Sequence, residues 1–260
     1  MPVMKQGAVK ILTAVLVIAV LLSSCSNASG SPEVLKKTVS GQIRAEDGTV
    51  VYSYEADYPE ITVPGNKSAA KKINSLINNE IKKIKEPEFD YIAQYNGFVS
   101  QGRQYFSGAS VSQSFFKTYC DNDLISFETT VYNHEACAVR DTETTRGMTF
   151  SLITGDTVGI YDIAADGENF KNKLISETEK QLAKLASEKD TADISVEDAL
   201  TIIENNGFGW YLSTNSLCVL FAPGDVAPIM YGTLTVEIPL SDFFNQPSNG
   251  STASVSGVSS

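Results

Sequence analysis

An apolar run near the start of the chain limits what this region can become. From Ile11 to Leu22 almost every residue is apolar, and Lys5 and Lys10 precede the run. A helix of this length is too short to cross the ~30 Å hydrocarbon core of a bilayer, which takes about 20 apolar residues. A short basic region followed by a short apolar core is typical of a secretory signal peptide. We therefore expect residues 1–24 to be a signal peptide and the rest of the chain to be exported.

The end of the apolar run resembles a known processing site. Leu22-Ser23-Ser24-Cys25 resembles the lipobox of bacterial lipoproteins, in which a leucine and two small residues precede a cysteine. The resemblance implies cleavage before Cys25, a diacylglyceryl thioether on its sulfur and an acylated amino terminus, often carrying palmitate. Several acyl chains anchor a protein more firmly than one, because each buried CH₂ contributes ~0.8 kcal/mol. We expect a lipid-anchored protein on the extracytoplasmic face of the cell membrane.

The chain is acidic, which excludes one class of partner and favours another. It has 31 acidic residues against 20 basic ones and a formal net charge of −11. Nucleic-acid binding needs clusters of lysine and arginine against phosphates, so no nucleic-acid partner is expected. An acidic surface favours association with a cationic partner. Acidity of this size also serves solubility alone, and the charge does not choose between these two interpretations.

Three cysteines remain once Cys25 is lipidated: Cys120, Cys137 and Cys218. An odd number of cysteines outside the cell allows at most one disulfide and leaves one thiol free. Cys120 and Cys137 flank a predicted strand, so they are the candidate disulfide pair. Three reduced thiols are the alternative, because disulfides persist only in an oxidising environment.

Low-complexity segments flank the predicted fold. Residues 25–48 contain the lipidated cysteine and then many Ser, Asn and Gly residues, which predicts a flexible tether. Residues 245–260 form a Ser/Gly tail without an apolar pattern, which predicts disorder.

Between these segments the hydrophobic period switches between strand and helix. Strands are predicted at residues 50–54, 91–92, 111–119, 124–132, 148–153, 158–161, 208–212, 217–221 and 233–239. Helices are predicted from Asn66 to Lys85, after Asp166, and after Ser195, with Asn66 and Ser195 as N-caps. The unequal runs favour an α+β fold of antiparallel sheets with packed helices. We divide it into two interlocked subdomains, residues 49–140 and 141–244.

Several of these segments share patterns with a known family. The motifs are Tyr58-Pro59-Glu60-Ile61, Phe150-Ser151-Leu152-Ile153-Thr154-Gly155-Asp156, Leu217-Cys218-Val219-Leu220-Phe221, Val226-Ala227-Pro228-Ile229-Met230-Tyr231-Gly232 and Val236-Glu237-Ile238-Pro239-Leu240. They resemble the bacterial secreted domains of the RsiV-like and PdaC-like family. The resemblance implies a stand-alone sensing or binding module, which binds the cationic protein lysozyme in RsiV-like members. Residues 135–140 depart from the Gly-Gly-Ala-His-like segment usual in the family.

The sequence offers few groups for catalysis. His134 is the only histidine, whereas catalytic zinc commonly takes two or three. Its spacing from Cys120 and Cys137 fits no compact metal motif, and residues 121–123 supply too few oxygen ligands for a calcium loop. No serine lies in a Gly-x-Ser-x-Gly elbow. We therefore expect no metal, no cofactor and no catalytic residue.

Two features keep a glycan-related function open. A glycosidase needs two carboxylates across a cleft, and the many acidic residues permit such a pair without singling one out. Phe208, Trp210 and Tyr211 form either a sugar-stacking surface or part of the core.

The sequence therefore predicts a non-catalytic extracytoplasmic binding or sensing lipoprotein. The first candidate ligand is a lysozyme-like cationic wall hydrolase. A peptidoglycan- or glycan-binding module is the alternative, followed by a cell-wall hydrolase. The sequence assigns no residue to the ligand.

Overall fold

The computed structural model describes residues 20–21, 30–103, 105–163, 167–188 and 193–242. The strands are β1 (Val20–Leu21), β2 (Glu33–Arg44), β3 (Val50–Thr62), β4 (Ala109–Cys120), β5 (Leu124–His134), β6 (Thr142–Ser151), β7 (Gly209–Leu212), β8 (Ser216–Phe221) and β9 (Leu234–Pro239). The helices are α1 (Lys67–Lys85), α2 (Tyr91–Ser100), α3 (Ile160–Ile163), α4 (Gly167–Glu188), α5 (Val196–Glu204) and the 3₁₀ turns η1 (Ile229–Tyr231) and η2 (Leu240–Asp242).

Several expectations fall outside this part of the chain. Cys25, almost all of the signal peptide at 1–24 and the tail at 245–260 are not among the described residues. Two residues of the apolar run are described, and they form β1, which pairs with β2. Within the described ranges, no helix combines the length and apolar character that a bilayer crossing requires.

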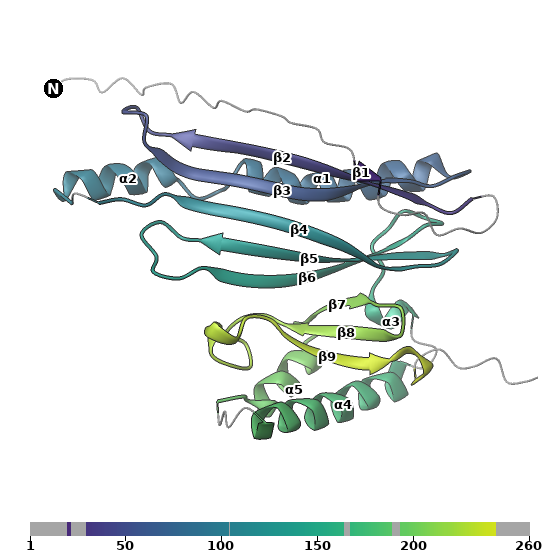
Figure 1. Cartoon of the computed structure of the whole chain (residues 1–260). Helices are drawn as coiled ribbons and strands as arrows, with labels where there is room; N and C mark the ends of the chain where they lie inside the picture. The colour runs from purple at the N-terminus through teal and green to yellow at the C-terminus, as the bar shows by residue number, and fades with distance from the viewer. Residues whose placement is uncertain (1–19, 22–29, 104, 164–166, 189–192, 243–260) are drawn as a thin grey trace, which may run out of the picture.

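The strands form two sheets, and the predicted α+β class is confirmed. The large sheet has the order β1-β2-β3-β4-β5-β6 and the small sheet the order β7-β8-β9. Figure 1 shows α1 and α2 on one side of the large sheet, with the small sheet below it and α4 and α5 beneath that. Neighbouring strands are antiparallel, as expected, except that β3 and β4 are parallel. The connection through α1 and α2 makes that parallel pairing feasible, since a parallel crossover needs a dozen or more residues.

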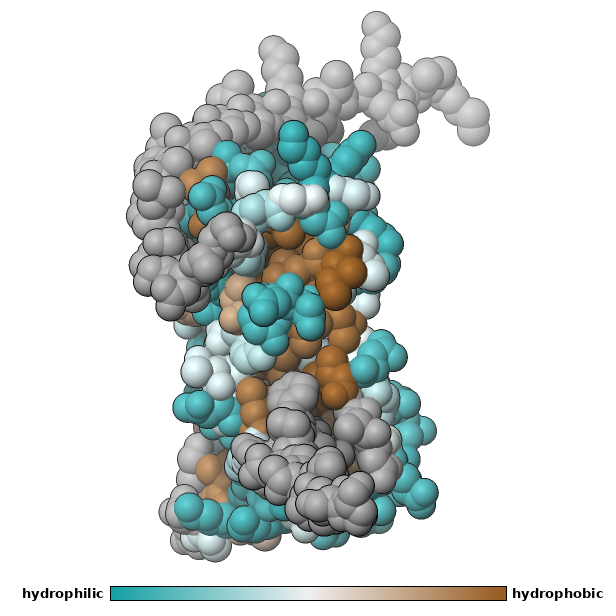
Figure 2. Space-filling view, turned by 90° about the vertical axis from the view of Figure 1, so that its right-hand side faces the viewer, coloured by the Kyte–Doolittle hydropathy of each residue, from teal (hydrophilic) through white to brown (hydrophobic). Residues whose placement is uncertain are grey.

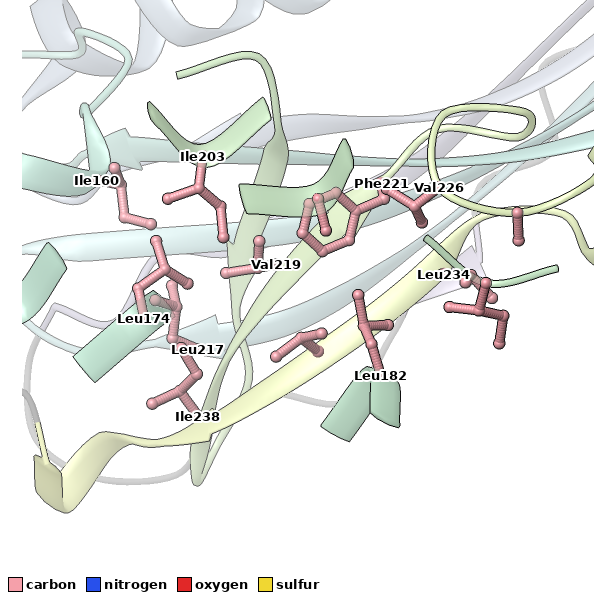
Figure 3. Close-up of a cluster of buried hydrophobic side chains, with 14 of the residues drawn as sticks. Ile160, Leu174, Leu182, Ile203, Leu217, Val219, Phe221, Val226, Leu234 and Ile238 are labelled. Carbon is pink, nitrogen blue, oxygen red and sulfur yellow. The ribbon is translucent and has the colours of Figure 1, made fainter. Parts of the chain in front are cut away.

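The small sheet shares its core with α4 and α5. Figure 3 shows apolar side chains of these helices meeting those of the strands, among them Leu174, Ile203 and Val219, which are fully buried. Both helices were predicted from their apolar spacing. Ser195 caps α5 as predicted, because its hydroxyl accepts a hydrogen bond of 3.1 Å from the amide of Asp198.

Helix α1 covers one face of the large sheet, which we call the inner face. It runs over the predicted residues, and the side chain of Asn66 caps it by accepting a hydrogen bond of 3.1 Å from the amide of Ala69. Ile73 and Ile77 are buried against residues of the sheet such as Phe127. The apolar stripe of this helix is therefore the source of the core on the inner face.

The side chain of Asn74 replaces a missing strand beside β3. Strand β3 pairs with β4 only from Tyr52 to Ala56. Further along, the amide of Ile61 donates to Asn74 Oδ1 at 2.8 Å, and Asn74 Nδ2 donates to the carbonyl of Ile61 at 2.9 Å. Pro59 lies in this stretch that β4 does not reach, where its missing N–H costs no ladder hydrogen bond to β4. One helix side chain thus satisfies both backbone groups of a buried residue.

The small sheet packs against the opposite face of the large sheet, which we call the outer face. The amide of Leu212 donates to the hydroxyl of Ser126 at 3.0 Å, and that hydroxyl lies 2.7 Å from the hydroxyl of Thr149. Gly147 lies under β7, where an added Cβ would overlap the carbonyl of Trp210. Glycine is needed here because the two backbones approach closely.

The flexible tether expected over residues 25–48 requires a correction. Residues 33–44 form β2, which pairs with β3 along its whole length apart from one irregularity near Arg44. Only Val34 and Val39 are buried, and the residues between and after them, such as Lys36, Lys37 and Ser40, remain accessible. The polar residues of an outer strand therefore hid its apolar pattern.

The division between subdomains also differs from the expected one. Strand β6 spans residues 142–151 and belongs to the large sheet, so the structure groups these residues with the part expected to end at 140. Phe150 on β6 is buried in the same cluster as Ile73 of α1. The apolar contacts of β6 thus join it to the first part of the chain.

Two predicted strands are wrong. Residues 91–92 begin α2, because Asp90 caps the helix by accepting from the amide of Ala93 and the ring of Tyr91 stacks on Tyr52 with centroids 4.8 Å apart. Residues 158–161 form no strand: a single bridge at Thr157 is followed by α3. Both segments are short, and a short apolar run does not distinguish strand from helix.

We predict that Asn74→Ala lowers the free energy of unfolding by about 2–4 kcal/mol. The substitution leaves two backbone groups of Ile61 unpaired, and each buried unsatisfied group costs about 1–3 kcal/mol. Urea denaturation measures the change. Asn78→Ala, on the exposed side of the same helix, is the matched control and should be neutral or slightly stabilising. Equal effects of the two substitutions would contradict the role of Asn74.

We also predict that Gly147→Ala destabilises the fold by about 1–3 kcal/mol, as overpacking does elsewhere. The added methyl group has to push β7 away from the large sheet. Thermal unfolding reports the effect. Gly97→Ala in α2 is the control, because its added Cβ meets nothing within 4 Å and replaces a glycine in a helix. A Gly147→Ala protein as stable as the parent would show that the sheets do not pack this closely.

Candidate functional site

The candidate disulfide between Cys120 and Cys137 is wrong. Cys120 ends β4, whereas Cys137 follows β5 and donates its amide to the carbonyl of Ser107 at 3.1 Å. Because β4 and β5 are antiparallel, the two cysteines lie at opposite ends of the hairpin, about 36 Å apart along β4 at ~3.3 Å per residue. A disulfide needs Cα atoms about 5.5 Å apart. None of the described cysteines, Cys120, Cys137 and Cys218, forms a disulfide.

His134 lies at the end of β5 and is paired with an acid. Its Nδ1 lies 2.8 Å from Asp141 Oδ1. Ser110 is directly opposite His134 on β4 but forms no hydrogen bond with the ring within the described residues. The arrangement is therefore a His–Asp pair without an activated nucleophile. The described part of the chain contains no group of three His, Cys, Asp or Glu placed to hold a metal ion.

The aromatic residues near β7 belong to the core. Tyr211 is buried, and burial raises the pKa of its phenol. Phe208 and Trp210 are partly buried and pack against the cluster between the small sheet and α4. Of the two interpretations of these residues, the core is the one the structure supports.

The open part of the outer face is the candidate functional site. The small sheet covers this face near Ser126 on β5 and Gly147 on β6, and the face of β2, β3 and β4 away from these contacts is uncovered. Sheet register places one row of side chains directly across five strands. The row is Ser40 on β2, Glu55 on β3, Ser112 on β4, Tyr132 on β5 and Glu143 on β6.

A second row lies beside the first, and together they form a shallow depression. The second row is Gln42, Ser53, Ser110 and His134. We call the hollow between β2 and β4 the serine depression. It is lined by Ser40, Gly41, Gln42, Arg44, Ser53, Tyr54, Glu55, Ser110, Val111 and Ser112. Small side chains on three adjacent strands leave the floor low and expose polar groups over it.

Two carboxylates on this face have no basic partner. Glu55 and Glu143 are exposed, and neither forms an ion pair in the part of the chain that the structure describes. By contrast, Asp57 on the same face is paired with Lys36 at 2.6 Å. Arg44 donates to Gln42 Oε1 and to a backbone carbonyl. The negative charge of Glu55 and Glu143 is therefore available to a ligand.

An exposed phenol lies between the two carboxylates along the row. Tyr132 is 44% exposed and directly opposite Glu143. The Glu143 carboxylate raises the pKa of the Tyr132 phenol above its usual value, because a phenolate beside it would be repelled. Tyr132 thus keeps its proton near neutral pH, donates its hydroxyl toward Glu143 and leaves its ring accessible.

The geometry of this face does not suit glycoside hydrolysis. Glu55 and Glu143 are separated by three strand spacings, about 14 Å at ~4.8 Å each. Glycosidase carboxylates lie about 5–9.5 Å apart. The face can therefore contact a ligand at several separated points, which is a binding arrangement.

Comparison with known proteins finds a family match for the second half of the fold. Residues 161–241 match the DUF3298 family. The description of that family is a protein of unknown function, DUF3298. The matched segment runs from α3 to the end of β9, so it contains the small sheet and its helices. The serine depression lies outside it. None of the curated proteins matches this chain.

One solved structure of a DUF3298 protein shares the fold at low sequence identity, and a second was also found. A DUF3298 family member from Bacteroides fragilis is 11% identical, covers 82% of this chain and 93% of its own, and superposes with a TM-score of 0.54. One from Pseudomonas aeruginosa is 12% identical, covers 83% of this chain and 93% of its own, and has a TM-score of 0.49. The similarity to the first structure extends beyond the matched family segment and includes most of the large sheet.

We predict that the described cysteines are alkylated independently of one another and that Cys137 reacts before Cys218. Cys137 is exposed and should be alkylated at least about tenfold faster than Cys218 at pH 8. Cys218 is buried, and burial raises the pKa of its thiol, so less thiolate is present at any given pH. Mass spectrometry of alkylated peptides from the native protein measures the order. A peptide linking Cys120 to Cys137 would contradict the structure.

Proposed function

We propose that this protein is a non-catalytic extracytoplasmic binding or sensing lipoprotein, anchored through Cys25, whose ligand is a cationic protein. The supporting observation is the pair of exposed, unpaired carboxylates, Glu55 and Glu143, on an open sheet face. An open face with unpaired charge suits a large ligand that brings complementary charge. The contact surface proposed is the serine depression with its neighbours Tyr132 and Glu143.

Binding fits this face better than catalysis. The two carboxylates are about 14 Å apart, too far to act on one glycosidic bond. His134 is paired with Asp141 but not with Ser110, so no nucleophile is activated by a base there. A ligand on this face is therefore held and not transformed.

A lysozyme-like wall hydrolase is the proposed class of ligand. The motifs shared with RsiV-like domains imply lysozyme binding, and lysozyme is cationic. The formal charge of this chain, −11, is complementary to such a partner and should accelerate association. The DUF3298 match is compatible with this relationship at the level of the fold.

A glycan ligand is the second candidate, and one observation favours it. Tyr132 exposes its ring between Ser112 and Glu143 on the same row. An exposed aromatic ring among hydroxyl and carboxylate groups can stack on a sugar while its neighbours bind hydroxyl groups. Such a ligand would depend on Tyr132 and little on charge.

The test is calorimetry of the soluble fragment from Ser26 to Ser260 with lysozyme at low and at physiological salt. We expect saturable one-to-one binding that weakens as salt rises, because exposed charge pairs are screened. Glu55→Gln and Glu143→Gln should each weaken binding about three- to tenfold, the effect expected for losing one favourable charge contact of about 1 kcal/mol. Glu204→Gln, an exposed carboxylate on α5, is the matched control and should leave binding unchanged.

The outcomes separate the two ligands. Binding that all three glutamine substitutions weaken equally would assign it to net charge and not to this face. No binding of lysozyme, with retention of the fragment on purified peptidoglycan, would favour the glycan. In that case Tyr132→Ala should release the fragment and Glu55→Gln should not.

A further inference from the structure

The fold begins close to the proposed lipid anchor. Glu33, the first residue of β2, follows Cys25 after only seven intervening residues, and Gly30 is the fifth residue after Cys25. A chain extends at most ~3.6 Å per residue, so Gly30 lies within about 18 Å of Cys25. The end of the large sheet that contains Gly30 must therefore stay near the lipid when Cys25 is acylated.

An apolar side chain projects from this same end. A hollow here is lined by residues from the segment before β2, the β3–α1 turn, the β4–β5 turn and the segment after β6. They include Gly30, Pro64, Asp121 and Ile153. Ile153 is 63% exposed, which is unusual for isoleucine in a soluble fold. Figure 2 views the molecule from the side on which these turns lie and shows an apolar strip along its middle.

The turn that presents Ile153 is held in place from both sides. Asn66 Nδ2 donates to the carbonyl of Leu152 at 3.0 Å and to that of Ile153 at 2.8 Å. The hydroxyl of Ser151 accepts from the amides of Ile153 and Thr154, both at 3.2 Å. The exposed position of the Ile153 side chain is therefore built into the turn by its own hydrogen bonds.

Charges on the α1 side of this end suit a phospholipid surface. Helix α1 begins here, has no acidic residue in its first turn, and exposes Lys67 and Lys71. The positive end of the helix dipole adds to these ammonium groups. Asp156, which lies near them, is already paired with Lys72. Asp121 and Asp123 in the β4–β5 turn are also exposed at this end, so phosphate headgroups would meet the ammonium groups of Lys67 and Lys71 on the α1 side of Ile153.

We propose that this end of the large sheet rests on the bilayer, with Ile153 entering the interface between headgroups and acyl chains. The inference rests on the proposed acylation of Cys25 and adds an orientation to it. Strand β2 then leads away from the lipid over 12 residues, about 40 Å at ~3.3 Å each, to Arg44 at the rim of the serine depression. The depression faces the extracytoplasmic space, where a large ligand can reach it.

The test uses two tryptophan variants of the acylated full-length protein, one at each end of the large sheet. Each variant is placed in vesicles of zwitterionic and anionic phospholipids. Trp210 is the only tryptophan, so Trp210→Phe removes the indole fluorescence of the parent protein. Ile153→Trp reports on the proposed contact. Val139→Trp is the matched control, because Val139 is 97% exposed in the loop between β5 and β6, at the other end of the hairpin. Brominated lipids quench indole groups that enter the interface.

We expect brominated lipids to quench the Ile153→Trp variant at least about twofold more than the Val139→Trp variant, with a blue shift only in the former. Equal quenching, or none at position 153, would overturn the orientation. If Trp210→Phe does not fold, both variants are made in the parent chain and its own signal is subtracted.

Mass spectrometry of the amino-terminal peptide separates this inference from the proposed anchoring. A chain without acyl groups on Cys25 would overturn both. An acylated chain whose Ile153→Trp variant is not quenched would overturn the orientation and leave the anchor and the ligand-binding proposal standing.

Discussion

The arrangement of the whole molecule depends on one buried contact between the two sheets. The amide of Leu212 at the end of β7 donates to the hydroxyl of Ser126, which shares a second hydrogen bond with Thr149. Ser126 is fully buried, and the neighbouring Gly147 leaves room for the backbone at Trp210. A polar group buried at such a contact is costly unless it is paired, so its hydrogen bonds specify one position of the small sheet. That position covers the outer face near Ser126 on β5 and Gly147 on β6 and leaves β2 to β4 open.

The candidate site is therefore a consequence of partial coverage. The inner face of the large sheet is closed by α1, and the small sheet is closed by α4 and α5. The uncovered part of the outer face is polar because serines occupy it on three strands. They include Ser40 on β2, Ser53 on β3 and Ser112 on β4. A sheet face can remain exposed to water in this way when its side chains are small and polar. The matched DUF3298 segment forms the small sheet and its helices, while the open face belongs to the large sheet.

The sequence predicted what local signals specify. The caps at Asn66 and Ser195 and the apolar spacing behind them located α1 and α5. Strand β2 was not predicted because most of its residues are polar and only Val34 and Val39 are buried. The strand predicted at 91–92 was wrong because it neglected the stacking of Tyr91 on Tyr52, a contact between residues far apart in sequence. The cysteine pairing failed for a related reason, since flanking a strand does not place two residues at the same end of it.

The candidate site could not be predicted from the sequence because it depends on register across five strands. Glu55 and Glu143 share a row only through the parallel pairing of β3 with β4 and two antiparallel pairings after it. Their separation of about 14 Å exceeds the screening length of about 8 Å at physiological ionic strength. The two carboxylates therefore attract cations independently, and one lysine or a small cation cannot neutralise both. A ligand that uses this face fully must present two positive groups at a matching distance on a rigid surface, which a folded cationic protein does and a short flexible peptide does only at an entropic cost.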